Sequence, residues 1–60
     1  MSDGMKAFVD FLHENKDNPR IIKNSEKFFQ MAHTLHEVES VGMRVDVDSV
    51  KEACRLIMEG

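Results

Sequence analysis

A chain of 60 residues with a single cysteine, Cys54, has few ways to hold itself together. A domain of this size buries only about 60% of the surface that its unfolded chain exposes, so its stability is marginal. Small domains commonly add disulfides, a metal or a second subunit, but one cysteine cannot form an internal disulfide. We therefore expect one domain, residues 1–60, that depends on well-packed helices, on self-association or on a partner.

Apolar residues recur at helical spacing from the start of the chain. Phe8 and Leu12, with their neighbours, fall within about 100° of one face, which predicts a helix from about residue 3 to residue 15. Asn18 followed by Pro19 is typical of a helix start, because asparagine caps a backbone N–H and proline lacks the N–H that would be unpaired. A second helix is expected to begin at Pro19.

The second helix carries two apolar stripes that do not coincide. At 100° per residue, the stripe that includes Phe28 is rotated by roughly 90° from the stripe that includes Leu35 and Val38. Thr34 begins a Thr-x-x-Glu pattern, which is typical of a helix N-terminus. We expect this helix to bend or to break near Thr34, with a break favoured, so that the chain forms three or four short helices.

Gly42 stands where the preceding helix should stop, because glycine enters the left-handed conformation without a steric penalty. Residues 43–47 are then expected to form an extended connection. Ser49 begins a Ser-x-x-Glu capping box and Asp48 is the alternative cap, so the last helix should begin at one of them.

The predicted fold class is all-α, a small bundle of three or four short helices. Its predicted core takes apolar side chains from every helix: Phe8, Leu12, Ile21, Phe28, Ala32, Leu35, Val38, Val50, Cys54 and Ile57.

Some apolar side chains lie off these core stripes. Phe11 points about 60° outside the apolar face of the first helix, and Leu56 is displaced similarly on the last helix. A phenylalanine and a leucine without a core role suggest a contact site. We predict a partner-binding surface that includes Phe11, Leu56, Ile22 and Phe29.

No pattern in the sequence predicts catalysis or a cofactor. The three scattered glycines form no phosphate-binding loop, and no nucleophile elbow is present. His33, His36 and Glu37 have a spacing that suits zinc, but a helical set needs a further ligand, and nothing in the sequence ensures that His13 or Glu14 approaches from the first helix. We expect surface histidines, a core thiol at Cys54 and no enzyme activity, metal or cofactor.

The charge balance argues against nucleic acid as a partner. The net charge is −3, and residues 31–60 carry three bases and six acids. Arg44, Lys51 and Arg55 could contact phosphate, but Glu52 and Glu59 share the same helix. No apolar run approaches the roughly 18 residues of a membrane span, and the N-terminus lacks a secretion signal. A cytoplasmic protein is expected.

Three segments together resemble one family. They are residues 5–12 (MKAFVDFL), residues 17–21 (DNPRI) and residues 42–53 (GMRVDVDSVKEA). In order and spacing they are similar to the nitrogen-fixation (Nif-eleven-type) leader-peptide family. The resemblance implies a helical leader domain that a peptide-modifying enzyme or exporter recognises while a C-terminal core peptide is processed.

Two functions follow as expectations, and both make the chain a protein-binding module. In the first, a modifying enzyme or exporter recognises the domain as a leader. In the second, the chain is a stand-alone regulatory protein, with a homodimer as one form, that binds and masks a protein target.

Overall fold

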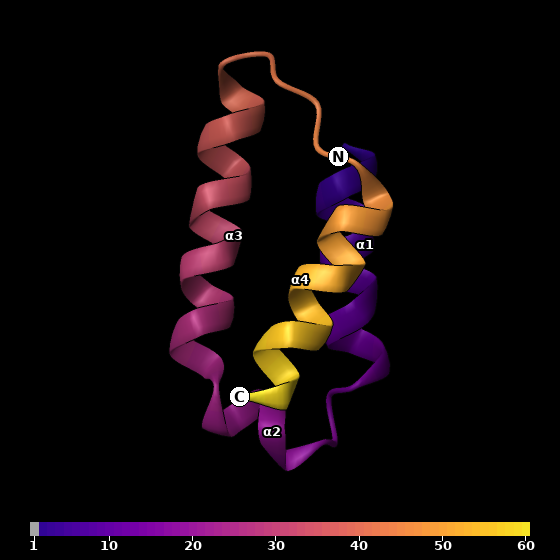
Figure 1. Cartoon of the computed structure of the whole chain (residues 1–60), viewed down its shortest axis with the longest axis vertical. Helices are drawn as coiled ribbons and strands as arrows, with labels where there is room; N and C mark the ends of the chain where they lie inside the picture. Colours follow the sequence, from indigo (N-terminus) through magenta and orange to yellow (C-terminus); the bar gives the residue numbers. More distant parts are fainter. Residues whose placement is uncertain (1) are drawn as a thin grey trace.

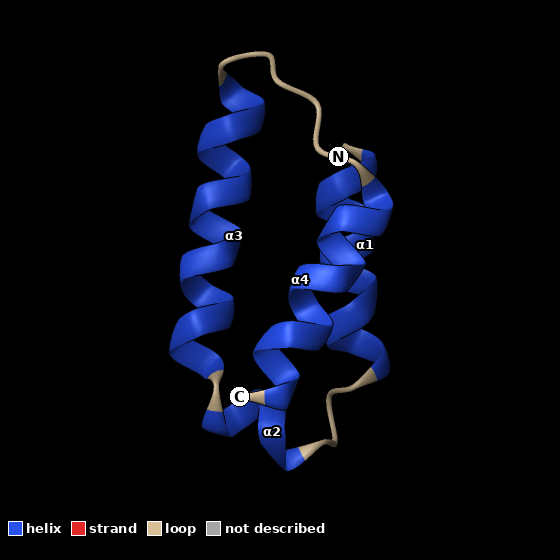
Figure 2. Cartoon of the chain, viewed as in Figure 1, coloured by secondary structure: helices blue, strands red, loops and turns tan. Residues whose placement is uncertain are grey.

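The computed structural model describes residues 2–60 of the chain. This part contains four helices (Figure 1). They are α1 (Asp3–Glu14), α2 (Pro19–Lys23), α3 (Ser25–Ser40) and α4 (Val47–Glu59). Over this range there is no strand, and short loops join the helices (Figure 2). The prediction of an all-α bundle is confirmed.

The three longer helices lie along the longest dimension of a molecule that measures 33 × 18 × 17 Å. α1 and α4 run in the same direction, side by side, and α3 runs the opposite way (Figure 1). The short α2 crosses one end of the bundle. The largest interface joins α1 to α4, which are the two helices farthest apart in the sequence.

The first two helices begin at side-chain caps. The Ser2 hydroxyl accepts the Met5 backbone N–H at 3.1 Å and starts α1. The Asn18 side-chain oxygen accepts the Arg20 N–H at 2.9 Å, and Pro19 is the first residue of α2. Each cap satisfies an N–H that has no carbonyl partner within its helix. The predicted start of the second helix at Asn18-Pro19 is confirmed.

The predicted break near Thr34 is wrong, because the helix breaks ten residues earlier, at Asn24. Asn24 ends α2 and precedes α3, and its side-chain amide donates to the Arg20 carbonyl at 3.0 Å. Such local bonds of asparagine compete with helix continuation. Phe28 and Leu35 are seven residues apart and therefore lie on one face of α3, which passes through Thr34 without interruption.

The end of α3 has the predicted glycine. Gly42 has φ = 87°. The Met43 N–H donates to the Val38 carbonyl at 3.3 Å and the Gly42 N–H to the Glu39 carbonyl at 3.1 Å, which is a Schellman motif. The left-handed helix stop at Gly42 is confirmed.

The start of α4 differs from the prediction. Its N-cap is Asp46, whose carboxylate accepts the Ser49 backbone N–H at 3.1 Å, and neither Ser49 nor Asp48 acts as the cap. An aspartate is as good a cap as serine. Because Asp46 lies two residues before Asp48, the helix is about half a turn longer than predicted. The connection is therefore shorter than expected, and Val47 belongs to α4.

The core lies where α1, α3 and α4 meet. The buried apolar residues are Ala7, Phe8, Phe28, Leu35, Val50 and Cys54. The Phe28 ring packs against Phe8 and Phe11 with centroid distances of 6.4 and 6.3 Å. Of the remaining predicted core residues, Leu12, Ile21, Ala32 and Ile57 are partly buried against this cluster, and Val38 is only partly buried. Ala7 is a core residue that the stripes did not predict.

One long-range hydrogen bond ties α2 to the end of α4. Arg20 Nη1 donates to the Met58 carbonyl at 3.1 Å. A cation at a helix C-terminus also interacts favourably with the helix dipole. Arg20 therefore helps to fix α2 across the end of the bundle.

Candidate functional site

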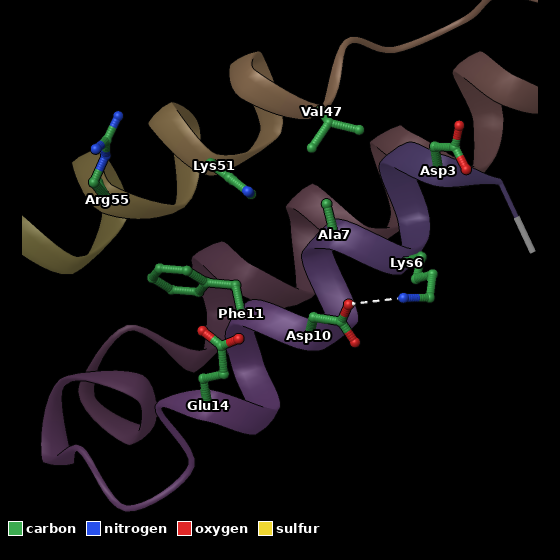
Figure 3. Close-up of a pocket in the computed structure, with 9 residues that line it drawn as sticks. All are labelled: Asp3, Lys6, Ala7, Asp10, Phe11, Glu14, Val47, Lys51 and Arg55. Atoms are coloured by element: carbon green, nitrogen blue, oxygen red, sulfur yellow. Dashed lines mark hydrogen bonds and ion pairs between the residues drawn. The ribbon is translucent and has the colours of Figure 1, made fainter.

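A groove between α1 and α4 is the best candidate for a binding site. It has a volume of about 490 Å³ and is open to solvent along its length. Ala7, Phe11 and Val47 supply apolar surface to it, and Figure 3 shows the Phe11 ring between the two helices. Volumes of this order are typical of ligand sites, but an open trough suits an extended or helical segment of a partner better than a small molecule.

The groove follows from residues spaced by four. On α1 the positions 3, 7 and 11 form one row and the positions 6, 10 and 14 form a second, while 47, 51 and 55 form a row on α4. Side chains four residues apart lie above one another on a helix, so each row makes a strip along the groove. Because α1 and α4 run in the same direction, the strips lie beside each other over about two turns (Figure 3).

The two walls of the groove differ in charge. On α1 the wall is acidic, with Asp3, Asp10 and Glu14 against one base, Lys6. Lys6 Nζ lies 3.3 Å from Asp10 Oδ2, and this pair stays on α1. We call these four residues the acidic wall.

On α4 the wall is basic and consists of Lys51 and Arg55. Arg55 is paired with Glu52 of the same helix, and Glu52 does not line the groove. We call Lys51 and Arg55 the basic wall. Among residues 2–60 no ion pair joins the two walls. Both walls therefore present charge to a molecule that sits on the groove.

Of the predicted partner-binding residues, only Phe11 lines the groove. Phe11 lines the groove, but it is partly buried and packs on Phe28, so it has a core role that the helix periodicity did not indicate. Ile22 on α2, Phe29 on α3 and Leu56 on α4 are 75%, 77% and 59% exposed and lie outside the groove.

The sequence does not predict most of the groove. Its pattern predicts Val47 in the connecting segment and gives Ala7 no role in the core or in a site. The spacing by four of Val47, Lys51 and Arg55 was visible in the sequence, but nothing in it indicates that this strip lies beside α1. Only the packing of the first helix against the last shows that.

The candidates for chemistry lie apart from this groove. Cys54 is 0% exposed, and desolvation by burial raises the pKa of its thiol above the ordinary value. A neutral, buried thiol is a poor nucleophile. His33 Nε2 lies 2.9 Å from Glu37 Oε1 on the exposed side of α3. Within residues 2–60, no three side chains of the metal-binding types come together as a ligand set.

Comparisons with other proteins give no relatives. No family model, no curated protein and no solved structure matches the chain significantly. The resemblance to leader peptides therefore stays a prediction. None of the helices in the described part of the chain is long and apolar enough to cross a membrane.

Proposed function

We propose that this domain is a protein-binding module of the leader-peptide type, and that a peptide-modifying enzyme or exporter engages the groove between α1 and α4. The observation that carries this proposal is the groove itself, which is open to solvent and has an apolar floor between walls of opposite charge. In this proposal the domain performs no catalysis of its own and holds no metal or cofactor.

The groove suits an amphipathic partner segment. Helix-in-groove recognition places the apolar side of a helix on an apolar floor, and charged rims set its direction and register. On this domain Ala7, Phe11 and Val47 would receive the apolar side. The basic edge of the segment would lie along α1 and its acidic edge along α4, so a segment inserted the other way round would meet like charges.

The test is capture of a modifying enzyme or exporter from the native host. The tagged wild-type chain and a Lys51→Glu/Arg55→Glu variant are used as baits, and bound proteins are identified by mass spectrometry. We expect the wild type to retain the enzyme or exporter and the variant to lose it. The control is Lys23→Glu/Lys27→Glu, which makes the same change of charge on α2 and α3, outside the groove. Equal capture by both variants would contradict the proposal.

A second candidate function rests on three of the exposed apolar side chains that lie outside the groove. Ile22, Phe29 and Leu56 give a stand-alone regulatory protein places to contact a target. In that case, Phe29→Ala or Leu56→Ala should abolish capture of a protein that is neither a modifying enzyme nor an exporter, while the basic-wall variant should retain it.

A further inference from the structure

The charge pattern of the groove is complementary to itself. The acidic wall carries three acids and one base, and the basic wall carries two bases and no acid. No ion pair within residues 2–60 crosses between them. A surface that carries both signs on parallel strips can pair with a rotated copy of itself, which is the requirement for an isologous interface.

We infer that a second copy of this chain covers the groove, in a two-fold symmetric dimer whose axis runs along the groove and in which the two grooves face each other. This rotation lays α1 of one copy over α4 of the other, and α4 of the first over α1 of the second. The acidic wall then meets the basic wall twice. The inference depends on the proposed function only in that the groove is a protein-binding surface.

The charges choose this axis over the alternative. A two-fold axis across the groove would lay α1 on α1 and α4 on α4, so acid would face acid and base would face base. Juxtaposed like charges disfavour an interface, and complementary ones fix its register. The axis along the groove also brings the two Phe11 rings toward the centre, where aromatic anchors contribute most to binding.

The size and net charge of the chain allow such a dimer. A standard interface covers about 800 Å² on each partner, which is under a fifth of the 4556 Å² surface of this molecule. Each copy carries a net charge of −3, which opposes association. At physiological ionic strength the screening length is about 8 Å, so the walls in contact outweigh charges elsewhere on the two copies.

The test is sedimentation equilibrium of the pure chain over a wide concentration range. We expect the wild type to pass from the 6.9 kDa monomer to a dimer of twice that mass, and high salt to weaken the dimer. Lys51→Glu/Arg55→Glu makes both walls acidic, and Asp10→Lys/Glu14→Lys makes both walls basic. Each pair of substitutions should raise the dissociation constant by about tenfold or more.

The four substitutions combined in one chain exchange the signs of the walls and should restore the dimer. Lys23→Glu/Lys27→Glu is the control for net charge and should dimerise nearly as the wild type does, apart from general repulsion. Circular dichroism of each variant verifies that it is folded, so that loss of the dimer is not loss of the fold. If Lys51→Glu/Arg55→Glu does not fold, the single substitutions Lys51→Gln and Arg55→Gln serve in its place, and each should weaken the dimer.

Three results would overturn the inference. The first is a wild type that stays monomeric at every concentration. The second is a quadruple variant that associates no better than the two double variants. The third is a dimer whose dissociation constant changes neither with salt nor with substitutions in either wall. A monomeric wild type whose capture of a modifying enzyme still depends on Lys51 and Arg55 would refute the dimer and leave the proposed function intact. If the dimer depends on the charged walls but capture of a modifying enzyme does not, the dimer stands and the proposed function is refuted.

Discussion

Replacing Phe28 and, separately, its neighbour Phe29 with alanine tests which face of α3 is in the core. Phe28 is 4% exposed and lies against the rings of Phe8 and Phe11, whereas Phe29 is 77% exposed. Truncating a buried phenylalanine costs about 3–5 kcal/mol, and a substitution on an exposed face usually changes stability by less than about 0.5 kcal/mol. The two variants remove the same atoms from adjacent positions, so each is the control for the other.

The expected loss is large relative to what the domain has. At about 0.05–0.15 kcal/mol per residue, a chain of 60 residues is stable by about 3–9 kcal/mol. Phe28→Ala should therefore unfold the domain or lower its melting temperature by more than about 12 °C, since each kcal/mol is worth about 4–8 °C at this size. Urea and thermal unfolding followed by circular dichroism measure both. A Phe29→Ala variant that loses as much stability as Phe28→Ala would refute the assignment of the faces of α3.

Three further predictions use the same unfolding measurements. Gly42→Ala should cost about 1 kcal/mol, because alanine resists φ = 87° although a β-carbon there would meet nothing within 4 Å; an unchanged midpoint would contradict the left-handed stop. Arg20→Ala should cost about 0.3–1 kcal/mol through its bond to the Met58 carbonyl, and Lys23→Ala, which lacks such a bond, should cost less. Burial raises the pKa of Cys54 in the folded state, so the unfolded chain loses this proton first and stability should fall as the pH rises above about 8.5. Cys54→Ala should remove that part of the fall in stability. If the variant and the wild type lose stability with pH in the same way, the thiol is not shielded from solvent in the folded state.

Features that depend on neighbouring residues were predictable from the sequence. The Asn18-Pro19 start, the stop at Gly42 and the burial of Phe8, Phe28 and Cys54 each follow from local bonds or helical periodicity. The break at Asn24 was not predicted, because the sequence contains competing capping patterns and only packing decides between them. Thr34 has a good capping pattern, but a break there would divide the face that buries Phe28 and Leu35 together.

The groove was beyond prediction for a different reason. Its strips lie on the first and last helices, and no local pattern says which helices of a bundle become neighbours. The periodicity predicts Phe11 off the main apolar face of its helix, whereas in the structure Phe11 is partly buried and packs against the Phe28 ring from α3. Leu56 has a similar position in the pattern of the last helix, yet it is 59% exposed.

The pairing of α1 with α4 also affects how the chain folds as it is made. The core needs Val50 and Cys54, which lie on α4 and are therefore synthesised after α1, α2 and α3. Until α4 has left the ribosome, α1 lacks the partner of its largest interface, and Phe8 and Phe28 have no closed core to enter. Contacts between distant parts of a chain also slow folding, because the ends must first be brought together. The nascent chain should therefore stay unfolded, and open to proteases and chaperones, until α4 has left the ribosome, and then fold in a single step.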